Sequence, residues 1–453
     1  MKKAIILIML FALIVPFFPS NSYASDQYLR VRIQAPIKSN EMVNLRSHSG
    51  FSIGLFDGEF KELKRISVEN INVIHNDDSI ILLDLEGNIL FSYEKNENVF
   101  ITSTNQDNPI VGVENNNYRD YISFLTNEKG LVVINITTLD HYLYGVVPKE
   151  MPYSFPIEAL KAQAVAARNF ALKNIGKHSK DGYDLCDSTD CQVYGGLNFE
   201  SNITNKAVDE TKSVLMKYND EIVDASYHSN SGGHTEDSIN VWGNDVPYLK
   251  GVDDPFSLEQ PNSKWECFLS LPDIKESLQK NGIDIGNIKN LGIVETTNSG
   301  RVSKLRVIGS TGEYVLEKEK IRQVFGYTTI KSNWFNIKPI GNENNNSEIS
   351  VIDGYSLKPK NVDMENVYTI NENGIVQNIK GETKNILSAN GEGKVSFAVQ
   401  NNDEVGFAFE GKGYGHGVGM SQWGAKGMAE LGYSYEEILK YYYKDIYITK
   451  ENM

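Results

Sequence analysis

The sequence has few cysteines, no block of positive charge and no apolar run long enough to span a bilayer. Three cysteines in 453 residues, Cys186, Cys191 and Cys267, allow at most one intramolecular disulfide, so the chain is not a small disulfide-held scaffold. Lys and Arg number 44 against 59 Asp and Glu, a formal charge of -15. Binding to nucleic acid or to anionic lipid needs clustered Lys and Arg, so we expect neither.

An apolar run at residues 4–18 follows two lysines and precedes a small-residue cleavage sequence ending at Ala24. These three parts predict a secretory signal peptide over residues 1–24. The run contains Pro16 and is shorter than the roughly 20 residues of a spanning helix, although an uncleaved N-terminal anchor is the alternative. Removing residues 1–24 would take away two lysines and no acids, which leaves a charge of -17.

Strand patterns dominate the N-terminal part of the chain. Residues 28–33 alternate between apolar and polar, residues 79–84 form an apolar run, and Gly87 lies in a hairpin turn. We therefore predict a β-rich accessory domain over residues 25–117, followed by a further strand at 130–136.

Helical patterns follow. Residues 156–174 begin with Pro156 and carry small residues at helical spacing, and residues 434–443 predict a last helix. Asn-rich residues 342–347 mark a polar break before a β-rich insertion at about 341–403. Together these patterns predict an α+β fold, with a mixed-sheet main domain over residues 118–448.

Residues 142–152 hold one carboxyl among apolar neighbours, between a predicted strand and the helix at 156. Glu150 follows Val146 and Val147 and precedes Met151. An apolar wall would raise the pKa of this carboxyl toward that of a general acid. Most glutamates are simply solvated, so the local sequence leaves both interpretations open.

A polar loop over residues 227–236 is followed in the sequence by Trp242. Such a loop could hydrogen-bond a sugar or peptide and stack on a ring, or it could be an ordinary turn with capping hydroxyls. There is no GxSxG motif, and nothing indicates that the first histidine serves as a base for the adjacent serine. The candidate binding residues are His228, Ser229, Ser231, His234, Thr235 and Trp242.

Glycine occupies every second position from 411 to 419. On a strand, alternate glycines leave a bare face for another backbone or a flat ligand, so His416 and Gln422 would face a groove. Structural close packing is the alternative. The GxxxxGK pattern at 406–412 does not make a phosphate loop, because Gly413 stands where Ser or Thr is needed.

His178, Cys186 and Cys191 could bind Zn²⁺ as an imidazole and two thiolates, with Asp190 or water as the fourth ligand. In an oxidising exterior the two cysteines could instead close a disulfide. We expect these three residues to be neighbours in space.

Taken in order, five stretches resemble the stage II sporulation protein D and amidase-enhancer family, SpoIID/LytB. They are YLYGVVPKEMP with EALKAQAVAAR (142–168), CDSTDCQVYGG (186–196), HSNSGGHTE with VWG and PYLKGV (228–252), SGRVSKLRVIG (299–309) and GKGYGHGVGMSQWGAKGMAELGYSYEEIL (411–439). The accessory domain and the insertion lie outside these stretches.

The resemblance implies a secreted or membrane-anchored cell-wall protein of a spore-forming bacterium. It implies a lytic transglycosylase that cuts peptidoglycan glycan strands at N-acetylmuramic acid and leaves anhydro ends, acting from a substrate groove. The family's catalytic glutamate falls on Glu150, as general acid and then base. No cofactor is required for that chemistry.

Some members of the family carry a zinc site, and where those members are expected to have His, position 190 here is Asp. The enhancer branch implies a second function, in which the groove binds glycan without cutting it and stimulates a cell-wall amidase. The expected partners are glycan strands and an amidase or other sporulation wall enzymes.

Overall fold

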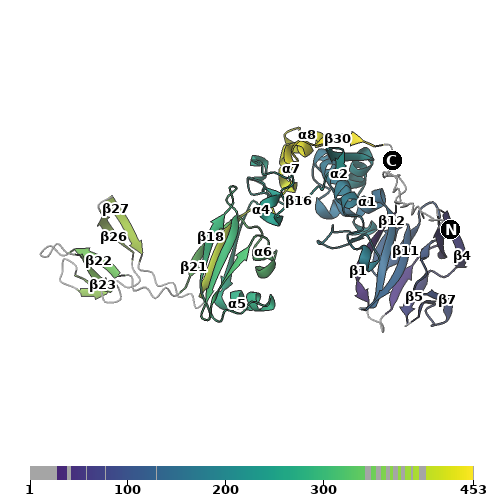
Figure 1. Ribbon diagram of the computed structural model, residues 1–453, viewed down its shortest axis with the longest axis horizontal. Coiled ribbons are helices and arrows are strands. Elements are labelled where there is room, and N and C mark those ends of the chain that lie inside the picture. Colours follow the sequence, from purple (N-terminus) through teal and green to yellow (C-terminus); the bar gives the residue numbers. More distant parts are fainter. Residues whose placement is uncertain are drawn as a thin grey trace, which may run out of the picture. The chain divides into compact units, whose positions relative to one another are not determined.

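The computed structural model describes residues 28–37, 42–57, 59–76, 78–128, 130–341 and 405–451, together with short strands between 348 and 396. The chain divides into two units (Figure 1). The first comprises residues up to 226 with 429–440 and 445 onward, and the second comprises 227–428 and 441–444. Helices and several separate sheets confirm the α+β prediction.

Two sheets form the base of the first unit. One has seven strands in the order β13-β1-β12-β11-β8-β3-β4, and the other has six in the order β10-β9-β2-β5-β6-β7. The strands are β1 (Tyr28–Ile37), β2 (Val43–Arg46), β3 (Phe51–Asp57), β4 (Glu59–Ile66), β5 (Asn70–His75), β6 (Ser79–Leu83), β7 (Ile89–Glu94), β8 (Val99–Ser103), β9 (Ile110–Val113), β10 (Asn116–Arg119), β11 (Tyr121–Asn127), β12 (Gly130–Thr138) and β13 (Leu185–Cys186).

The predicted boundary at residue 117 does not separate two folded units. It falls inside β10, and the long sheet pairs β1 with β12 and β8 with β11. Strands from both sides of the boundary thus satisfy each other's backbone hydrogen bonds. The predicted accessory domain is therefore part of the first unit.

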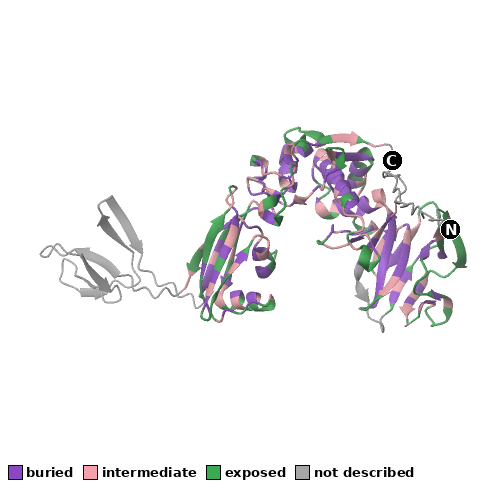
Figure 2. Ribbon diagram, viewed as in Figure 1, coloured by how far each residue is buried: buried purple, intermediate pink, exposed green. Residues whose placement is uncertain are grey.

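Helices cover the C-terminal end of β12. They are α1 (Leu139–Glu150), α2 (Ile157–Lys173) and α3 (Asn202–Glu210), with the 3-10 turns η1 (Ser179–Asp181) and η2 (Leu197–Phe199) between them. Helix α2 matches the prediction for 156–174 and is buried along most of its length, with Ala at many of the buried positions (Figure 2). Small side chains let α1 and α3 pack closely against it.

The end of the chain returns to the first unit. Strand β30 (Tyr447–Lys450) pairs with β14 (Val214–Tyr218), whose other neighbour is β15 (Glu221–Ile222). Helix α8 (Tyr435–Tyr442) confirms the last predicted helix.

The second unit has two three-stranded sheets around one apolar core. They are β17 (Lys264–Ser270), β28 (Gly406–Lys412) and β21 (Phe335–Ile340), then β18 (Ile288–Thr296), β19 (Val302–Gly309) and β20 (Glu313–Glu317), with α5 (Leu271–Lys280) and α6 (Lys320–Phe325) beside them. A smaller part of this unit contains most of the family stretches at 228–252 and 411–439. Its elements are β16 (Tyr227–His228), α4 (Ser238–Trp242), η3 (Pro255–Ser257), β29 (Met420–Ser421) and α7 (Gln422–Glu430).

Among the described residues of the predicted β-rich insertion, six strands pair as three hairpins. They are β22 (Glu348–Ile352) with β23 (Pro359–Asp363), β24 (Tyr368–Ile370) with β25 (Val376–Asn378), and β26 (Thr383–Ser388) with β27 (Gly391–Ser396). The predicted signal peptide at 1–24 and the polar break at 342–347 lie outside the described residues. Within the described part of the chain, no helix is both long and apolar enough to cross a bilayer.

Candidate functional site

Glu150 is the last residue of helix α1, which corrects the predicted loop between strand and helix. The helix begins where the Thr138 hydroxyl accepts a hydrogen bond from the backbone N–H of His141, at 3.3 Å. It ends where Met151 donates its backbone N–H to the carbonyl of Val147 at 2.9 Å, and Pro152 follows. Thr is a residue type that favours the start of a helix, so Thr138 was a signal in the sequence for this helix.

The residues next to Glu150 in sequence that were predicted to form an apolar wall are buried. Val146, Val147 and Met151 are all fully buried, whereas Glu150 itself is half-buried. Tyr142, two turns earlier on α1, is also buried, and burial raises its pKa well above the ordinary value, assisted by Cys191, Tyr194 and Glu150 nearby. Glu150 and the Cys191 thiol therefore both act electrostatically on the same buried tyrosine.

The CDSTDCQVYGG motif packs directly against α1. Tyr142 donates its hydroxyl to Gln192 at 3.3 Å, and its ring lies 5.0 Å from that of Tyr194. A Cβ on Gly145 would come within 2.4 Å of the Tyr194 ring. Glycine is therefore required at 145, because any side chain would push the motif away from the helix.

Exposed aromatic side chains accompany Glu150 in the first unit. Phe199 is 45% exposed, and the Lys149 ammonium lies 4.0 Å from the centre of its ring. Tyr153, three residues after Glu150, is 63% exposed. Exposed rings offer flat apolar faces, and such faces suit sugars. The sequence prediction missed both residues, although Tyr153 directly follows one family motif and Phe199 lies three residues after another.

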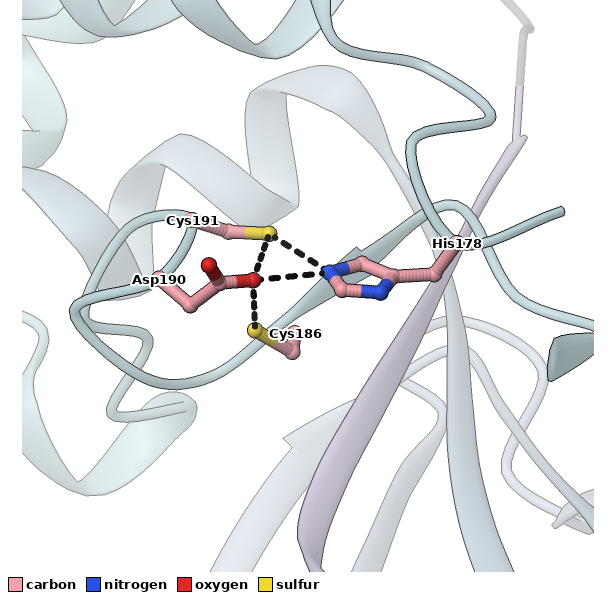
Figure 3. A group of neighbouring side chains, drawn as sticks. All are labelled: His178, Cys186, Asp190 and Cys191. Atoms are coloured by element: carbon pink, nitrogen blue, oxygen red, sulfur yellow. Dashed lines mark hydrogen bonds and ion pairs between the residues drawn. The ribbon is translucent and has the colours of Figure 1, made fainter. Parts of the chain in front are cut away.

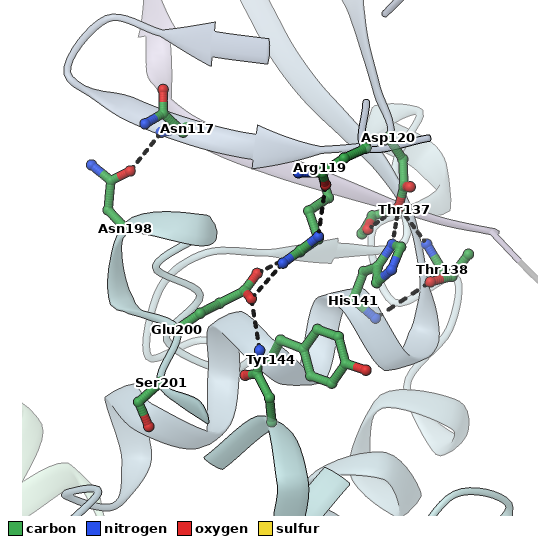
Figure 4. A network of polar contacts seen from close by, with 12 residues as sticks. Asn117, Arg119, Asp120, Thr137, Thr138, His141, Tyr144, Asn198, Glu200 and Ser201 are labelled. Carbon is green, nitrogen blue, oxygen red and sulfur yellow. Dashed lines mark hydrogen bonds and ion pairs between the residues drawn. The ribbon is translucent and has the colours of Figure 1, made fainter. Parts of the chain in front are cut away.

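A polar network holds the first turn of α1 on the sheet (Figure 4). The His141 ring contacts the Asp120 carboxylate at 2.8 Å, and the same carboxylate accepts the Thr137 hydroxyl at 2.7 Å. Arg119 donates two hydrogen bonds to Glu200, at 2.7 and 2.8 Å. These contacts tie α1 and η2 to the end of β10, so the helix that carries Glu150 has a rigid base.

His178, Cys186, Asp190 and Cys191 converge (Figure 3), and one possible ligand atom from each lies within 4.8 Å of the others. The imidazole Nε2 is 3.3 Å from the Cys191 sulfur and 3.0 Å from an Asp190 oxygen. This confirms the prediction that His178 and the two cysteines are neighbours. The fourth donor is Asp190. Family members that carry a zinc site were expected to have His at this position.

The donor set fits a divalent metal such as zinc, which binds two thiolates, an imidazole and a carboxylate oxygen in tetrahedral sites. All three cysteines carry free thiols. Burial raises the pKa of the Cys191 thiol to about 12. Burial would also raise the pKa of Asp190, but hydrogen bonding to Lys177 and the charges of Lys177 and His178 lower it. The carboxylate therefore stays ionised.

In the second unit the stretches at 228–252 and 411–439 lie side by side. Tyr227 and His228 in β16 pair in parallel with Met420 and Ser421 in β29. Farther along, the backbones of Asn230 and Tyr414 exchange hydrogen bonds at 3.0 and 2.7 Å. Segments almost 200 residues apart in sequence thus form one structure.

Three predicted binding residues form a row of rings. Trp242, 44% exposed, lies 5.2 Å from the His416 ring, which lies 5.6 Å from that of buried His228. The Nδ1 of His228 is 3.1 Å from the Val418 carbonyl, and the Nδ1 of His416 accepts from the Val418 N–H at 3.1 Å. Burial lowers the pKa of both, to about 3 for His416. Both rings are therefore neutral at neutral pH.

The alternate glycines do not form the predicted strand. Strand β28 ends at Lys412, and the glycines from 413 to 419 all have positive φ. A Cβ on Gly415 would lie 2.7 Å from that of His228, and one on Gly417 would lie 2.8 Å from the Arg301 guanidinium. Close backbone approach is thus confirmed, but through left-handed turns and not along a pleated face.

Arg301 and Glu236 fix this loop, and sequence analysis had singled out neither. Arg301 donates to the carbonyls of Ser231 and His234 at 2.8 and 2.7 Å. Burial would raise the pKa of Glu236, but hydrogen bonds from Asn240, Ser299 and Thr297 and the charge of Arg301 outweigh burial and lower it. Glu236 is therefore an ionised, fully bonded structural group.

Several of the other predicted binding residues are engaged inside the protein. Ser231 is fully buried and donates to Asp254 at 2.7 Å, and buried Thr235 accepts the Val252 N–H at 2.8 Å. Gln422 is 8% exposed, whereas Ser229 and His234 are half-buried. Glu150 and the cysteine cluster belong to the first unit, and all the predicted binding residues belong to the second.

Comparison with known proteins adds to this geometry. A family model described as stage II sporulation protein matches residues 127–218, which contain Glu150 and the cysteine cluster, and a domain of unknown function matches residues 257–358. The amidase enhancer of Bacillus subtilis (strain 168) is 34% identical over 309 residues, 68% of this chain and 40% of that protein. The chain thus spans less than half the length of this relative.

Two other relatives are covered more fully. Stage II sporulation protein D of Bacillus amyloliquefaciens is 27% identical over 328 residues, 69% of this chain and 74% of that protein. An uncharacterized protein of Brachyspira hyodysenteriae is 26% identical over 432 residues, 95% of each chain.

Proposed function

The chain belongs to the SpoIID/LytB family, and from this premise we propose that it is a peptidoglycan lytic transglycosylase acting in cell-wall remodelling during sporulation. The observation that carries the proposal is the position of Glu150. It is the last residue of helix α1, its neighbours Val147 and Met151 are buried, and it is itself half-buried. A half-buried carboxyl at a helix end is open to a substrate and can transfer a proton as a general acid.

One carboxyl can carry out the whole reaction. Protonated Glu150 donates its proton to the glycosidic oxygen as the bond from that oxygen to C1 of N-acetylmuramic acid breaks. The C6 hydroxyl of the same sugar then attacks C1, and the Glu150 carboxylate takes the hydroxyl proton. The proton count balances and no water is consumed, so the product carries a 1,6-anhydro ring.

The exposed rings of Phe199 and Tyr153 support a sugar substrate, because each offers a flat apolar face in the unit that holds Glu150. In the second unit, the row formed by Trp242, His416 and His228 offers another ring face with an adjoining polar loop. We propose that these faces bind glycan.

The test is digestion of purified peptidoglycan by the wild type and by Glu150→Gln, with anhydro-muropeptides measured by mass spectrometry. The wild type should release them and the variant should not. Equal release by both proteins would contradict the role of Glu150. Release of reducing ends without an anhydro ring would instead identify a hydrolase.

A second function is suggested by the relative named amidase enhancer. In this reading the protein binds glycan and stimulates a separate cell-wall amidase. Glu150→Gln tests it as well, because a binding role predicts that the variant still raises amidase turnover on whole walls. Unchanged amidase turnover with either protein would exclude this function.

We further propose that the cluster of His178, Cys186, Asp190 and Cys191 holds zinc, which would supply a structural cross-link between η1 and the family motif. Metal analysis after chelator-free purification should give about one zinc per chain. A disulfide would instead leave Cys267 as the single reactive thiol after denaturation.

A signal peptide at 1–24 would place the protein outside the cytoplasm, which protease accessibility on intact cells tests.

A further inference from the structure

A hollow of about 600 Å³ lies in the first unit and adjoins the cysteine cluster, because Asp181 in its lining lies 3.7 Å from the His178 ring. Four turns line it, and the strands that lead into them lie together (Figure 1). They are the turns after β5 (His75 and Asn76), after β7 (residues 95–98) and at the end of β11 (residues 125–127), and η1 with Gly182. Its volume is within the range of ligand sites, roughly 300–1,000 Å³.

The lining is polar and balanced in charge. Four asparagines and Thr126 contribute groups that both donate and accept hydrogen bonds. Lys95 and Lys180 are matched by Glu97 and Asp181, so the formal charges cancel. Among the described residues that line the hollow there is no Phe, Tyr or Trp, and Leu125 is the single aliphatic one.

Several of these polar groups are not used within the described part of the chain. Asn76 accepts the backbone N–H groups of Asp78 and Ser79 through its oxygen, at 3.0 and 2.7 Å. This fixes the amide and leaves its NH₂ group as a donor. The side chains of Asn96 and Asn98 are exposed on the same wall, and His75 has a buried Nε2 that finds no hydrogen-bond partner among the described residues.

We propose that this hollow is an accessory binding site for a neutral, acetamido-bearing sugar of a glycan strand. Amides and hydroxyls match sugar hydroxyl and acetamido groups, whereas a charged ligand would leave one sign of the lining unmatched. The choice of a glycan rests on the proposed function. The turn at residues 125–127, which lines the hollow, lies at the opposite end of β12 from helix α1.

Such a site would hold the polymer at a distance from Glu150. Both belong to one unit, so a strand bound in the hollow would raise the effective concentration of its neighbouring segments at Glu150. The role of the strands before residue 117 would then be to anchor substrate.

Photo-crosslinking tests the proposal. Full-length Glu150→Gln protein is irradiated with chitotetraose that carries a diazirine, and labelled peptides are mapped by mass spectrometry. Residues 95–98 or 180–182 should be labelled, and free chitotetraose should compete. Replacing both Asn96 and Asn98 by Ala should reduce this labelling about tenfold, the effect of losing one or two hydrogen bonds.

Asn105→Ala is the matched control, because this exposed asparagine belongs to the same unit but does not line the hollow. Labelling that avoids the four turns, or that is unchanged in the double variant, would overturn the proposal. If a zwitterionic stem peptide reduced the labelling and free chitotetraose did not, the ligand would not be a neutral sugar and the proposal would be overturned. None of these outcomes depends on lytic activity, so a failure of the proposed function would be seen separately.

Discussion

Glu150 in the first unit and Glu236 in the second both lie in family motifs, but the protein holds them in different ways. Glu236 is 3% exposed and accepts hydrogen bonds from Thr297 and Ser299 on one oxygen and from Asn240 and the Asp237 backbone on the other. Glu150 is half-buried at a helix end, beside apolar residues. A carboxylate with every lone pair engaged is a structural anion, whereas a partly desolvated and accessible carboxyl can exchange a proton.

The same contrast extends to the surroundings. In the second unit Arg301, Ser231 and Asp254 form closed, buried contacts that hold the motif loops together. In the first unit the residues around Glu150 include exposed rings, namely Phe199 and Tyr153. Motif membership alone therefore does not identify a catalytic group, and the second unit's motif residues serve largely to build the loop that presents Trp242 and His416.

The largest expected effect separates the two glutamates by activity. Glu150→Gln should reduce release of anhydro-muropeptides by about 100-fold or more, the usual contribution of a general acid. Glu236→Gln should reduce release per folded molecule by less than about tenfold, because Glu236 acts on the loop and not on the substrate. A larger loss in Glu236→Gln than in Glu150→Gln would reverse the comparison.

The next effect concerns stability in the second unit. Arg301→Met removes a buried cation whose charge favours ionised Glu236 and leaves two carbonyls without their donor, so unfolding in urea should require about 3 kcal/mol less. Arg306→Met, at an exposed position of strand β19, which begins directly after Arg301, is the control and should change stability by less than about 0.5 kcal/mol. Equal losses of stability in the two variants would show that the buried contacts of Arg301 contribute no more than an exposed arginine does.

A smaller effect is expected at the glycines. Gly417→Ala combines a left-handed backbone with a contact of 2.8 Å to Arg301, and should cost about 2 kcal/mol. Gly432→Ala in the first unit has a similar φ but nothing within 4 Å of the added carbon, so it should cost about 1 kcal/mol. Thermal unfolding of both variants measures the difference. A cost at Gly432 equal to that at Gly417 would assign the whole effect to the backbone.

The smallest effect is one of salt. A mature chain of charge -17 should be repelled by anionic, peptide-bearing walls and less by glycan strands without peptides. Raising the salt from about 0.05 to 0.15 M should therefore increase activity on peptide-bearing walls by a few-fold, and leave activity on peptide-free glycan nearly unchanged. If activity on peptide-bearing walls did not rise with salt, charge repulsion would be excluded as the reason for a preference for glycan without peptides.

Local patterns predicted much of the fold. The helix at 156–174, the last helix and the strands at 28–33, 79–84 and 130–136 are present, because their periodicity and end residues act within a few positions. The errors share a cause. The boundary at 117 and the glycine strand at 411–419 both required knowledge of which distant backbone lies alongside, and no local pattern carries that information.

The sequence by itself determined the α+β class, the family and the candidate glutamate, because motif residues and their order are properties of the chain. Only the tertiary structure decided which polar residues remain available. It joined Arg301 to the carbonyls of Ser231 and His234, buried Ser231 and Thr235, and brought His178 to the two cysteines and Asp190. The physical reason is that hydrogen bonding and burial depend on partners far away in sequence, so the same residue type is structural in one environment and reactive in another.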